Sequence, residues 1–385
     1  MLNSALFTGF VALAAACGMP DHPGYKAPKK TAITNVKVFD GTKFGRETTV
    51  VIVGDIISNA HPAGAMVVDA KGGYLIPGLI DSHCHINSCS YLDAMRQYGV
   101  TTALDMGTYP YASVKACRAP GVTDVYGSGA AGTVNGTSIS HFPGFPTDSF
   151  IPNATAGQQF VADRLAEGAD YIKIILDPKG PDSATLAAVV QAAQSAGKLV
   201  ITHAPLYYDY QEASQAGVEI PTHAPLDKPV DAAIIANFTA NRYFRGAVPT
   251  LIMMQSITNN TGQSYSHYTL NAEGSVTNMI KAGVPMIAGS DANLSPYVPA
   301  NPPFGLSMHE ELELLVAAGL TPTDAIVGAT SRAASTFRLH DRGTIRTGFR
   351  ADLVLLSADP TVDIRNSRSI ERVWIKGIEA NLTSV

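Results

Sequence analysis

The central part of this chain alternates short apolar runs with longer amphipathic stretches, and this alternation limits its fold more than any other feature. Tyr171–Leu176 (YIKIIL) is predicted to be a buried strand. Ala184–Ala196 is predicted to be a helix, because its apolar residues recur three and four positions apart and Gly197 ends it. The alternation continues through strand Leu199–His203, helix Tyr210–Ala216, strands Val218–His223 and Val248–Ile252, helix Ala272–Ala282 and strand Val284–Gly289. This order is typical of βα units around a parallel sheet.

Both ends of the chain carry a different pattern, in which short strands are joined by turns. Thr31–Ile76 has this pattern, and Ala351–Ser357 and Glu371–Lys376 are predicted strands near the other end. A length of 385 residues suits a barrel of parallel strands and helices, which often exceeds about 250 residues as one domain. We therefore predict an α/β fold, a (β/α)₈ TIM barrel with a small β-sandwich formed from both chain ends. The predicted parts are an N-terminal extension at 1–30, the first part of the sandwich at 31–76, the barrel at 77–341 and the second part of the sandwich at 342–385.

Composition limits the class of partner. Apolar residues make up 46% of the chain and charged residues 15%, which allows a large core and argues against disorder. The net charge of −5 is not gathered in acidic or basic blocks, so we expect no nucleic-acid partner. No stretch reaches the roughly 18 apolar residues of a membrane span, so we expect a soluble globular protein.

The compartment stays open at this stage. Ala5–Cys17 has the length of the apolar region of a signal peptide, but no Lys or Arg precedes it. The protein is thus either secreted, with about the first 19 residues removed, or cytoplasmic with a frayed extension. Asn-x-Ser/Thr motifs, which matter only on a secretory route, occur at Asn135, Asn153, Asn237, Asn259, Asn293 and Asn381. The four cysteines show no Cys-x-x-Cys pair and no framework spacing, so neither a disulfide scaffold nor a zinc finger is expected.

The first candidate for chemistry is GLIDSHCH at residues 78–85. Residues two apart on a strand project to the same side, so His83 and His85 point together and Cys84 points away. Two imidazoles at the carboxyl end of a barrel strand form half of a metal site. Taken alone, the pair is also compatible with two hydrogen-bonded histidines of the core.

Four further candidate ligands lie at the ends of predicted later strands: Lys173, His203, His223 and Asp291. A barrel would place each of these side chains over its centre. Each also has a structural alternative, since the lysine can be a surface residue, the histidines can be structural and the aspartate can cap a helix. The apolar run around Lys173 favours burial, which is costly for an ammonium group unless it is neutralised or paired. Reaction with carbon dioxide would convert this lysine into a carbamate that can bridge two cations.

With these residues in view, the chain resembles the amidohydrolase superfamily in its binuclear form with a carboxylated lysine. The resemblance covers roughly Thr31 to Glu379 and includes the opening motif PGLIDSHCH, the late segment HEELELLVAAGLTPTDAIVGATSRAA and the closing GFRADLVLLSADP. These segments look most like the imidazolonepropionase-like, prolidase-like and ochratoxinase-like branch. Cys84 stands where many relatives have Thr, and the segment between Lys173 and His203 is compact, but neither departure removes a ligand.

The resemblance implies a centre with two divalent metal ions, for which zinc is the first expectation and manganese, cobalt or iron would fit. It assigns His83, His85 and Asp291 to the buried ion, and His203 and His223 to the more exposed one. Carboxylated Lys173 would bridge the two. Two such ions activate a water molecule and polarise a substrate carbonyl, and Asp291 would act as general base and then general acid.

Substrate contacts are expected outside this set. His141, in the Gly-rich segment 126–145, is a candidate for binding a substrate carbonyl or carboxylate, and Tyr207 and Tyr208 are candidates for the pocket wall. The alternative is that these are ordinary loop residues. His309 is expected to support Asp291 from outside the ligand set.

We predict from this set a hydrolase that cleaves an amide-type carbon–nitrogen bond of a small molecule, an N-acyl amino acid or a dipeptide. The same metals could instead serve a lactonase or esterase, or a lyase or isomerase that does not use water. A binding protein without activity is disfavoured, because the ligand set is complete. A homo-oligomer is expected.

Overall fold

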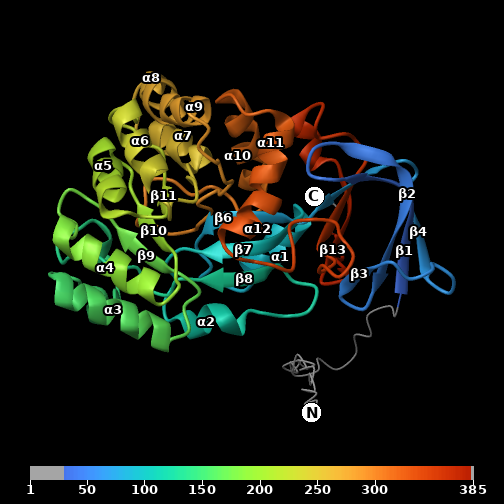
Figure 1. Cartoon of the computed structure of the whole chain (residues 1–385), viewed down its shortest axis with the longest axis horizontal. Helices are drawn as coiled ribbons and strands as arrows, with labels where there is room; N and C mark the ends of the chain where they lie inside the picture. Colours follow the sequence, from blue (N-terminus) through green and yellow to red (C-terminus); the bar gives the residue numbers. More distant parts are fainter. Residues whose placement is uncertain (1–29, 383–385) are drawn as a thin grey trace, which may run out of the picture.

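The computed structural model describes residues 30–382 of the chain. The predicted signal segment or extension at 1–30 lies almost entirely outside these residues, and so does Cys17. Figure 1 shows the two parts of the fold side by side, with a sheet from the chain ends on one side and the helices and inner strands on the other. Among the described residues, no helix is long and apolar enough to cross a membrane.

The two ends of the chain meet in one eight-stranded sheet, whose path runs β14-β13-β12-β5-β1-β2-β3 with β4 paired to β1. Its apolar face includes Ile33, Leu75, Leu353 and Trp374, all fully buried. The expected joining of the two ends is therefore present, while their arrangement as a sandwich stays a prediction. The strands are β1 (Lys30–Phe39), β2 (Phe44–Val53), β3 (Ile56–Ser58), β4 (Met66–Asp69), β5 (Tyr74–Pro77), β12 (Leu353–Leu356), β13 (Ile370–Ile375) and β14 (Ile378–Glu379).

The inner strands form two three-stranded parallel sheets, β6-β7-β8 and β9-β10-β11. Single parallel bridges link the sheets and the segments between them: Gly132 with Ile174, Thr222 with Val248, Ala247 with Met286, and Cys84 with Ala292. The parallel pairing thus leads from β6 through both sheets and back to β6. The bounds are β6 (Leu79–Cys84), β7 (Val100–Asp105), β8 (Asp124–Gly127), β9 (Ile172–Ile175), β10 (Val200–His203) and β11 (Ile220–Thr222).

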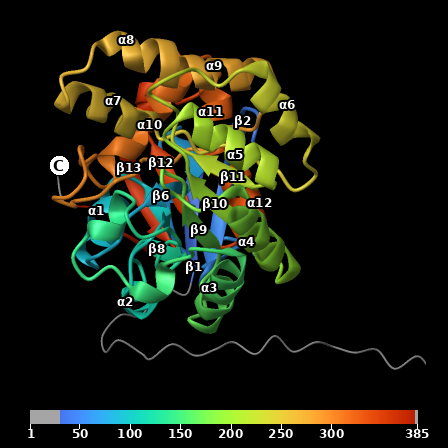
Figure 2. The ribbon, with the colours of Figure 1, turned by 90° about the vertical axis from the view of Figure 1, so that its left-hand side faces the viewer.

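Helices surround these inner strands, as Figure 2 shows in the view turned by 90°. Several begin at the side-chain caps that favour helix starts; for example, Asn153 accepts from Ala156 N at 3.0 Å, and Asp182 accepts from Thr185 N at 2.7 Å. The α-helices are α1 (Ser90–Gln97), α2 (Tyr111–Ala116), α3 (Ala154–Ala166), α4 (Ser183–Ser195), α5 (Tyr207–Ala216), α6 (Ala232–Ala240), α7 (Leu251–Asn260), α8 (Tyr265–His267), α9 (Gly274–Lys281), α10 (Leu306–Ala317), α11 (Pro322–Gly328) and α12 (Ser331–Thr336). Shorter turns are η1 (Ile139–His141), η2 (Thr147–Ser149), the π-helical η3 (Tyr268–Glu273) and η4 (Ile364–Arg368).

Two predicted strands are shorter in the structure than expected. In Val248–Ile252, only Val248 pairs with a strand, and helix α7 already begins at Leu251. In Val284–Gly289, only Met286 forms a bridge. At Gly289 the chain passes so close to β6 that an added Cβ would lie 2.9 Å from the backbone nitrogen of His83.

One disulfide corrects the expectation from the cysteines. Cys89 and Cys117 are bonded and join the start of α1 to the end of α2. They stand 28 residues apart, without the spacing of a known framework, so the sequence did not show the pair. Cys84 is a buried free thiol.

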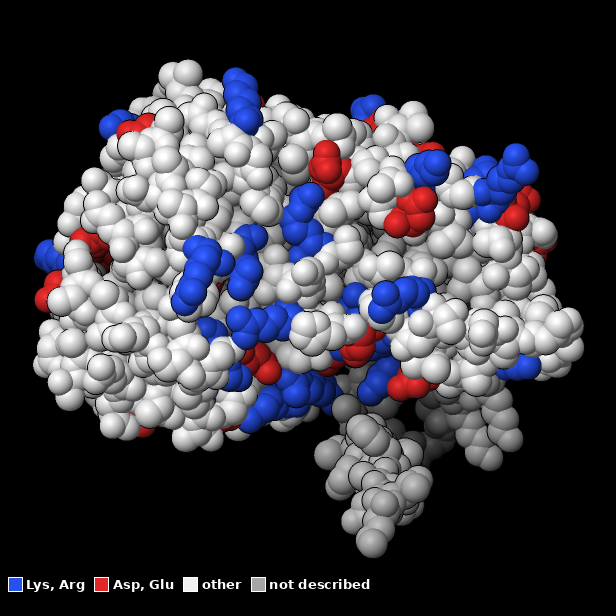
Figure 3. All heavy atoms as spheres, in the orientation of Figure 1, with Lys and Arg blue, Asp and Glu red and all other residues white. Residues whose placement is uncertain are grey.

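Charged side chains are sparse on much of the surface seen in Figure 3, and most of the Lys and Arg on this face gather near its middle. Part of the charge lies inside the molecule. The carboxylate of Asp124 in β8 pairs with Arg342 at 3.0 Å and with Arg350 at 2.5 Å, and both arginines are buried. The two guanidinium groups hold the pKa of this carboxyl at about 2, although burial alone would raise it.

Candidate metal centre

The six predicted ligands all line one cavity of about 640 Å³ at the carboxyl ends of the inner strands. His83 belongs to β6, Lys173 to β9 and His203 to the last position of β10. His85, His223 and Asp291 lie in the segments that follow β6, β11 and Met286. Because parallel strands present their carboxyl ends at the same edge, six residues from five distant places in the sequence converge here.

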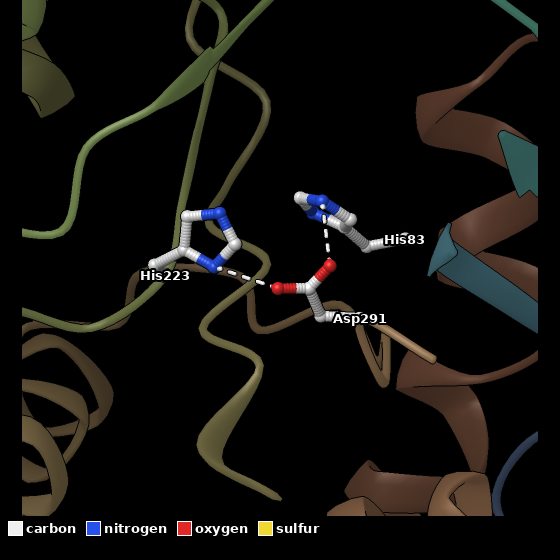
Figure 4. Close-up of side chains that lie close together, drawn as sticks. All are labelled: His83, His223 and Asp291. Atoms are coloured by element: carbon white, nitrogen blue, oxygen red, sulfur yellow. Dashed lines mark ion pairs between the residues drawn. The ribbon is translucent and has the colours of Figure 1, made fainter. Parts of the chain in front are cut away.

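Asp291 is the centre of the group, as Figure 4 shows for its contacts with two histidines. Its carboxylate lies 3.5 Å from His83 Nε2 and 3.7 Å from His223 Nδ1. The same carboxylate lies 3.1 Å from His85 Nε2. Ligand atoms of His83, His223 and Asp291 lie within 4.8 Å of one another, so these three residues could hold a metal ion.

His203 completes the histidine cluster from the other side. Its ring lies 4.4 Å from the ring of His223, measured between centroids, and the ring of His223 lies 4.8 Å from that of His83. Burial holds the pKa of His203 at about 3 and those of His83 and His223 far below their usual value. Neutral imidazole is the form that binds metals.

One buried nitrogen atom, His223 Nε2, supports a metal at this place, because it has no hydrogen-bond partner among the described residues. A buried polar atom without a partner costs about 1–3 kcal/mol, so this imidazole fits a bound ion better than an apolar core. In His83 the nitrogen that faces Asp291 is Nε2. Thr250 accounts for the other nitrogen of His223, because its hydroxyl lies 2.8 Å from Nδ1.

Lys173 is buried, with 1% of its surface exposed, and its Nζ donates to Thr222 Oγ1 at 3.1 Å. Burial lowers the pKa of this ammonium group to about 7, against the opposing effect of Asp291 and Asp105. A lysine of this kind is partly neutral near neutral pH and is then a nucleophile. It fits the expected carbamate, and the surface-lysine alternative is wrong.

Two aspartates that the sequence analysis did not single out hold the ligand-bearing segments in place. Asp81 accepts from Ser290 Oγ at 2.5 Å and from the backbone of His83 at 3.2 Å, which ties β6 to the segment before Asp291. Burial raises the pKa of Asp81 to about 6. Asp105, at the end of β7, accepts from Ile86 N at 2.6 Å and so fixes the chain after His85. Both aspartates follow apolar runs, as the ligands do, and that position was the available signal.

The segment 126–145 lines the cavity as expected, but the three predicted contact residues His141, Tyr207 and Tyr208 are not among the described residues that line it. His141 is exposed at the end of η1. Tyr207 donates to Asp231 at 2.5 Å, and Tyr208 is 57% exposed and donates to Glu212 at 2.8 Å. Both tyrosines lie in the first turn of α5, where their hydroxyl groups are held by neighbouring acids.

His309 has a structural role instead of the expected support of Asp291. Its Nδ1 lies 2.8 Å from Ser367 Oγ and its Nε2 lies 3.0 Å from the carbonyl oxygen of Tyr98. Both ring nitrogens are therefore used to join α10 to η4 and to the end of α1. Asn293, which follows Asp291, is the residue whose side chain supports this segment, by donating to the Asp291 carbonyl at 2.9 Å.

Comparison with known proteins decides the family. The sequence profile described as the amidohydrolase family matches residues 74–379. The chain belongs to the amidohydrolase family. The resemblance drawn from the sequence is thereby confirmed, and with it a metal-dependent class of enzyme.

Individual relatives of this amidohydrolase are distant. Adenine deaminase 2 of Rhizobium etli is 26% identical over 356 residues, which cover 86% of this chain and 54% of that protein. The chain thus spans about half the length of this relative. Imidazolonepropionase of Anaeromyxobacter sp. is 26% identical over 360 residues, covering 78% of this chain and 79% of that protein. One similar solved structure is the crystal structure of an Xaa-Pro dipeptidase with bound methionine in the active site. Its TM-score is 0.78 at 19% sequence identity, and the match covers 91% of this chain and 100% of that one. The two proteins therefore share the fold.

Proposed function

We propose that this amidohydrolase cleaves an amide-type carbon–nitrogen bond of a small molecule with water, in the cavity that holds the six residues. The observation that carries the proposal is the convergence of His83, His85, Lys173, His203, His223 and Asp291 on one cavity. The names of the relatives agree, since a deaminase, an imidazolonepropionase and a dipeptidase are among them.

We infer that the inner strands form a (β/α)₈ barrel, with the domain bounds and the two-ended sandwich predicted above. The parallel pairing that returns to β6 supports the barrel. The shared sheet of the chain ends supports a second, smaller domain at 31–76 and 342–385. A homo-oligomer remains part of the proposal.

We propose the ligand set that the sequence predicted. His83, His85 and Asp291 would hold one divalent ion, and His203 and His223 would hold a second. Carboxylated Lys173 would bridge them. The buried Nε2 of His223, which has no hydrogen-bond partner, supports this set, and nitrogen with carboxylate oxygen is the donor set that zinc favours.

When bound, the ions would lower the pKa of a water molecule and polarise the scissile carbonyl. Asp291 lies within 3.7 Å of three imidazoles and would take a proton from the nucleophile and give it to the leaving nitrogen. Thr250 keeps the ring of His223 in one orientation through the bond to Nδ1.

Replacement of Lys173 tests the function directly. Lys173→Ala should lose most of the bound metal and most of the activity, because the bridging anion is gone. Short carboxylates added to the solution should restore part of both. Lys179→Ala is a matched control, since Lys179 is exposed six residues away. The measurements are elemental analysis and turnover of a panel of N-acyl compounds, with oxygen from labelled water followed into the product.

Full metal content and full turnover in Lys173→Ala would contradict the binuclear proposal. Turnover without incorporation of labelled oxygen would instead indicate a lyase or isomerase. Faster cleavage of lactones or esters than of amides would indicate a lactonase or esterase.

A further inference from the structure

The Lys, Arg, Asp and Glu side chains of the cavity are confined to the proposed metal centre, which we call its floor. Among the described residues that line the cavity, Lys173 is the only Lys or Arg and Asp291 is the only Asp or Glu. Both belong to the proposed metal centre. The walls therefore offer no cationic side chain that could pair with a carboxylate of a substrate.

The walls are formed by apolar and aromatic side chains from separate segments. Ring contacts join the segment after β8 to the segments opposite it: Phe142 lies 5.4 Å from Tyr297, and Phe145 lies 6.0 Å from Tyr109. Helix α7 adds the side chains Met253, Met254 and Ile257. Methionine and aromatic side chains suit a flat or flexible apolar group of the ligand.

Several polar groups of the walls are already used within the protein. The Asn293 amide donates to the carbonyl oxygens of Asp291 and Ala300. The Thr108 hydroxyl donates to Asp105 at 2.6 Å. The Ser295 hydroxyl accepts from Tyr297 N, so its own proton is not used in that contact. The donors of Asn293 and Thr108 are therefore used within the loops, and a neutral hydroxyl is a weaker partner for a carboxylate than an arginine.

We propose that the cavity takes uncharged substrates, in which the scissile carbon–nitrogen bond carries an aromatic or alkyl group and no carboxylate. This inference deepens the proposed function and rests on it. A carboxylate against these walls would lose part of its hydration without gaining a cationic partner, which is costly for any ionised group. N-acyl amines and anilides therefore fit the cavity, and N-acyl amino acids and free dipeptides do not.

A matched pair of compounds tests the proposal on the metal-loaded enzyme. N-acetylphenethylamine and N-acetylphenylalanine differ only in the carboxylate. We expect kcat/KM to be at least about tenfold higher for the uncharged member, because the other must bury an unpaired charge. A ratio of one or below would overturn the inference.

A charge-insertion variant gives an independent readout. Tyr297 lines the cavity and is 58% exposed, so Tyr297→Arg places a cation on the wall with room for the side chain. The ratio of kcat/KM between the two compounds should shift toward the carboxylate by about tenfold, the scale of one charge-assisted hydrogen bond. Tyr265→Arg is the control, since Tyr265 is 52% exposed and lies outside the cavity lining. An equal shift in both variants would contradict the assignment.

Failure of the proposed function can be told apart from failure of this inference. If the enzyme binds metal but cleaves neither these compounds nor any member of the N-acyl panel, the hydrolytic function is wrong. Calorimetric titration of the same uncleaved pair then decides the substrate class. Tighter binding of N-acetylphenethylamine supports the inference that the cavity takes uncharged substrates. Equal or tighter binding of N-acetylphenylalanine overturns that inference.

Discussion

Two proposed ligands that line the cavity, and one residue in contact with one of them, hold backbone conformations that L-amino acids rarely adopt. The φ angle is 70° at His223, 47° at Thr250 and 57° at Asp291. Positive φ is least expected at Thr250, because its β-branched side chain is crowded there. Strain of this kind costs about 1–3 kcal/mol per residue and persists where the surroundings enforce it, often at active sites. Here it directs two proposed ligands and the hydroxyl that contacts one of them.

Thr250 is therefore expected to act as a positioning residue. Thr250→Val keeps the branched shape but removes the hydroxyl from His223 Nδ1. Metal affinity should fall by about 10–100-fold, the usual cost of losing a partner of a metal-binding histidine. Competition with a chromogenic chelator measures this affinity.

Thr250→Ser is the matched variant, because it retains the hydroxyl and should keep an affinity near that of the wild type. If the valine variant bound metal normally, or if the serine variant were equally impaired, the hydroxyl would have no part in holding His223.

The sequence was informative for residues whose side chain itself carries the chemistry. His83 and His85 could be predicted because alternate strand residues share a face. Lys173 stood out because an ammonium group within an apolar run is unusual. Thr250 gave no such signal, since a threonine in an apolar segment resembles any strand residue and its positive φ depends on distant packing. The predicted contacts His141, Tyr207 and Tyr208 rested on proximity in sequence, which does not determine the direction in which a side chain points.

At the level of elements, regular periodicity was sufficient to predict a helix whose first residue is set by a local cap. The predicted helix Ala184–Ala196 is α4, Ser183–Ser195, with its cap at Asp182. The strand predicted at Val284–Gly289 reduces to a bridge at Met286. Apolar composition shows that such a segment is buried, but the number of residues that pair depends on neighbours remote in sequence.

The disulfide is an element-scale feature with a measurable effect. Replacing Cys89 and Cys117 with serine frees the two ends of a loop closed across 28 positions. The free energy of unfolding should fall by about 2–4 kcal/mol, mainly because the unfolded chain gains freedom. Denaturant titration in the absence of reductant measures the difference.

The same titration with reductant supplies the control. The wild type should then approach the double serine variant, and the variant should not change. A wild type as unstable as the variant without reductant would show that the bond contributes nothing.

Glu311 in α10 links that helix to α7 and makes stability depend on pH. Its Oε2 accepts from Ile252 N at 2.8 Å, and burial raises its pKa to about 8 from an ordinary value of 4.5. Between these values the folded protein keeps a proton that the unfolded chain has released, so stability falls as pH rises through this window. Below pH 4.5 the effect is absent, because both states are protonated.

Glu311→Gln should remove this dependence while keeping an oxygen for Ile252 N. Relative to the wild type, the variant should gain at least about 1.4 kcal/mol of unfolding free energy between pH 5 and pH 9, the equivalent of one pKa unit. Glu310→Gln, at the neighbouring and partly exposed position, should leave the pH profile as it is. Parallel profiles for Glu311→Gln and the wild type would show that the carboxyl group is charged in the folded state.

On the scale of the whole molecule, the sheet made from both chain ends shows that the sequence pattern predicts strands but not their order in the sheet. The strands at both ends were predictable from their alternation and turns. Their order in the sheet, with β12 between β13 and β5, depends on pairings across most of the chain. Residues Leu353 and Trp374 are buried against Leu75 in the same core, so the second end is needed to cover the first.

Metal should matter for the whole molecule as well as for the reaction, because the six proposed ligands come from five segments that fold back to one place. An ion that binds the folded chain alone stabilises it by about 4 kcal/mol at a concentration a thousandfold above its Kd. Removal by a strong chelator should therefore lower the thermal unfolding midpoint by several degrees and abolish turnover, and added zinc should restore both. In Lys173→Ala the chelator should change the midpoint little, since most of the metal is already absent. A wild-type midpoint that does not respond to chelation, in protein shown by elemental analysis to have lost its metal, would mean that the histidines and Asp291 are arranged by the fold without help from an ion.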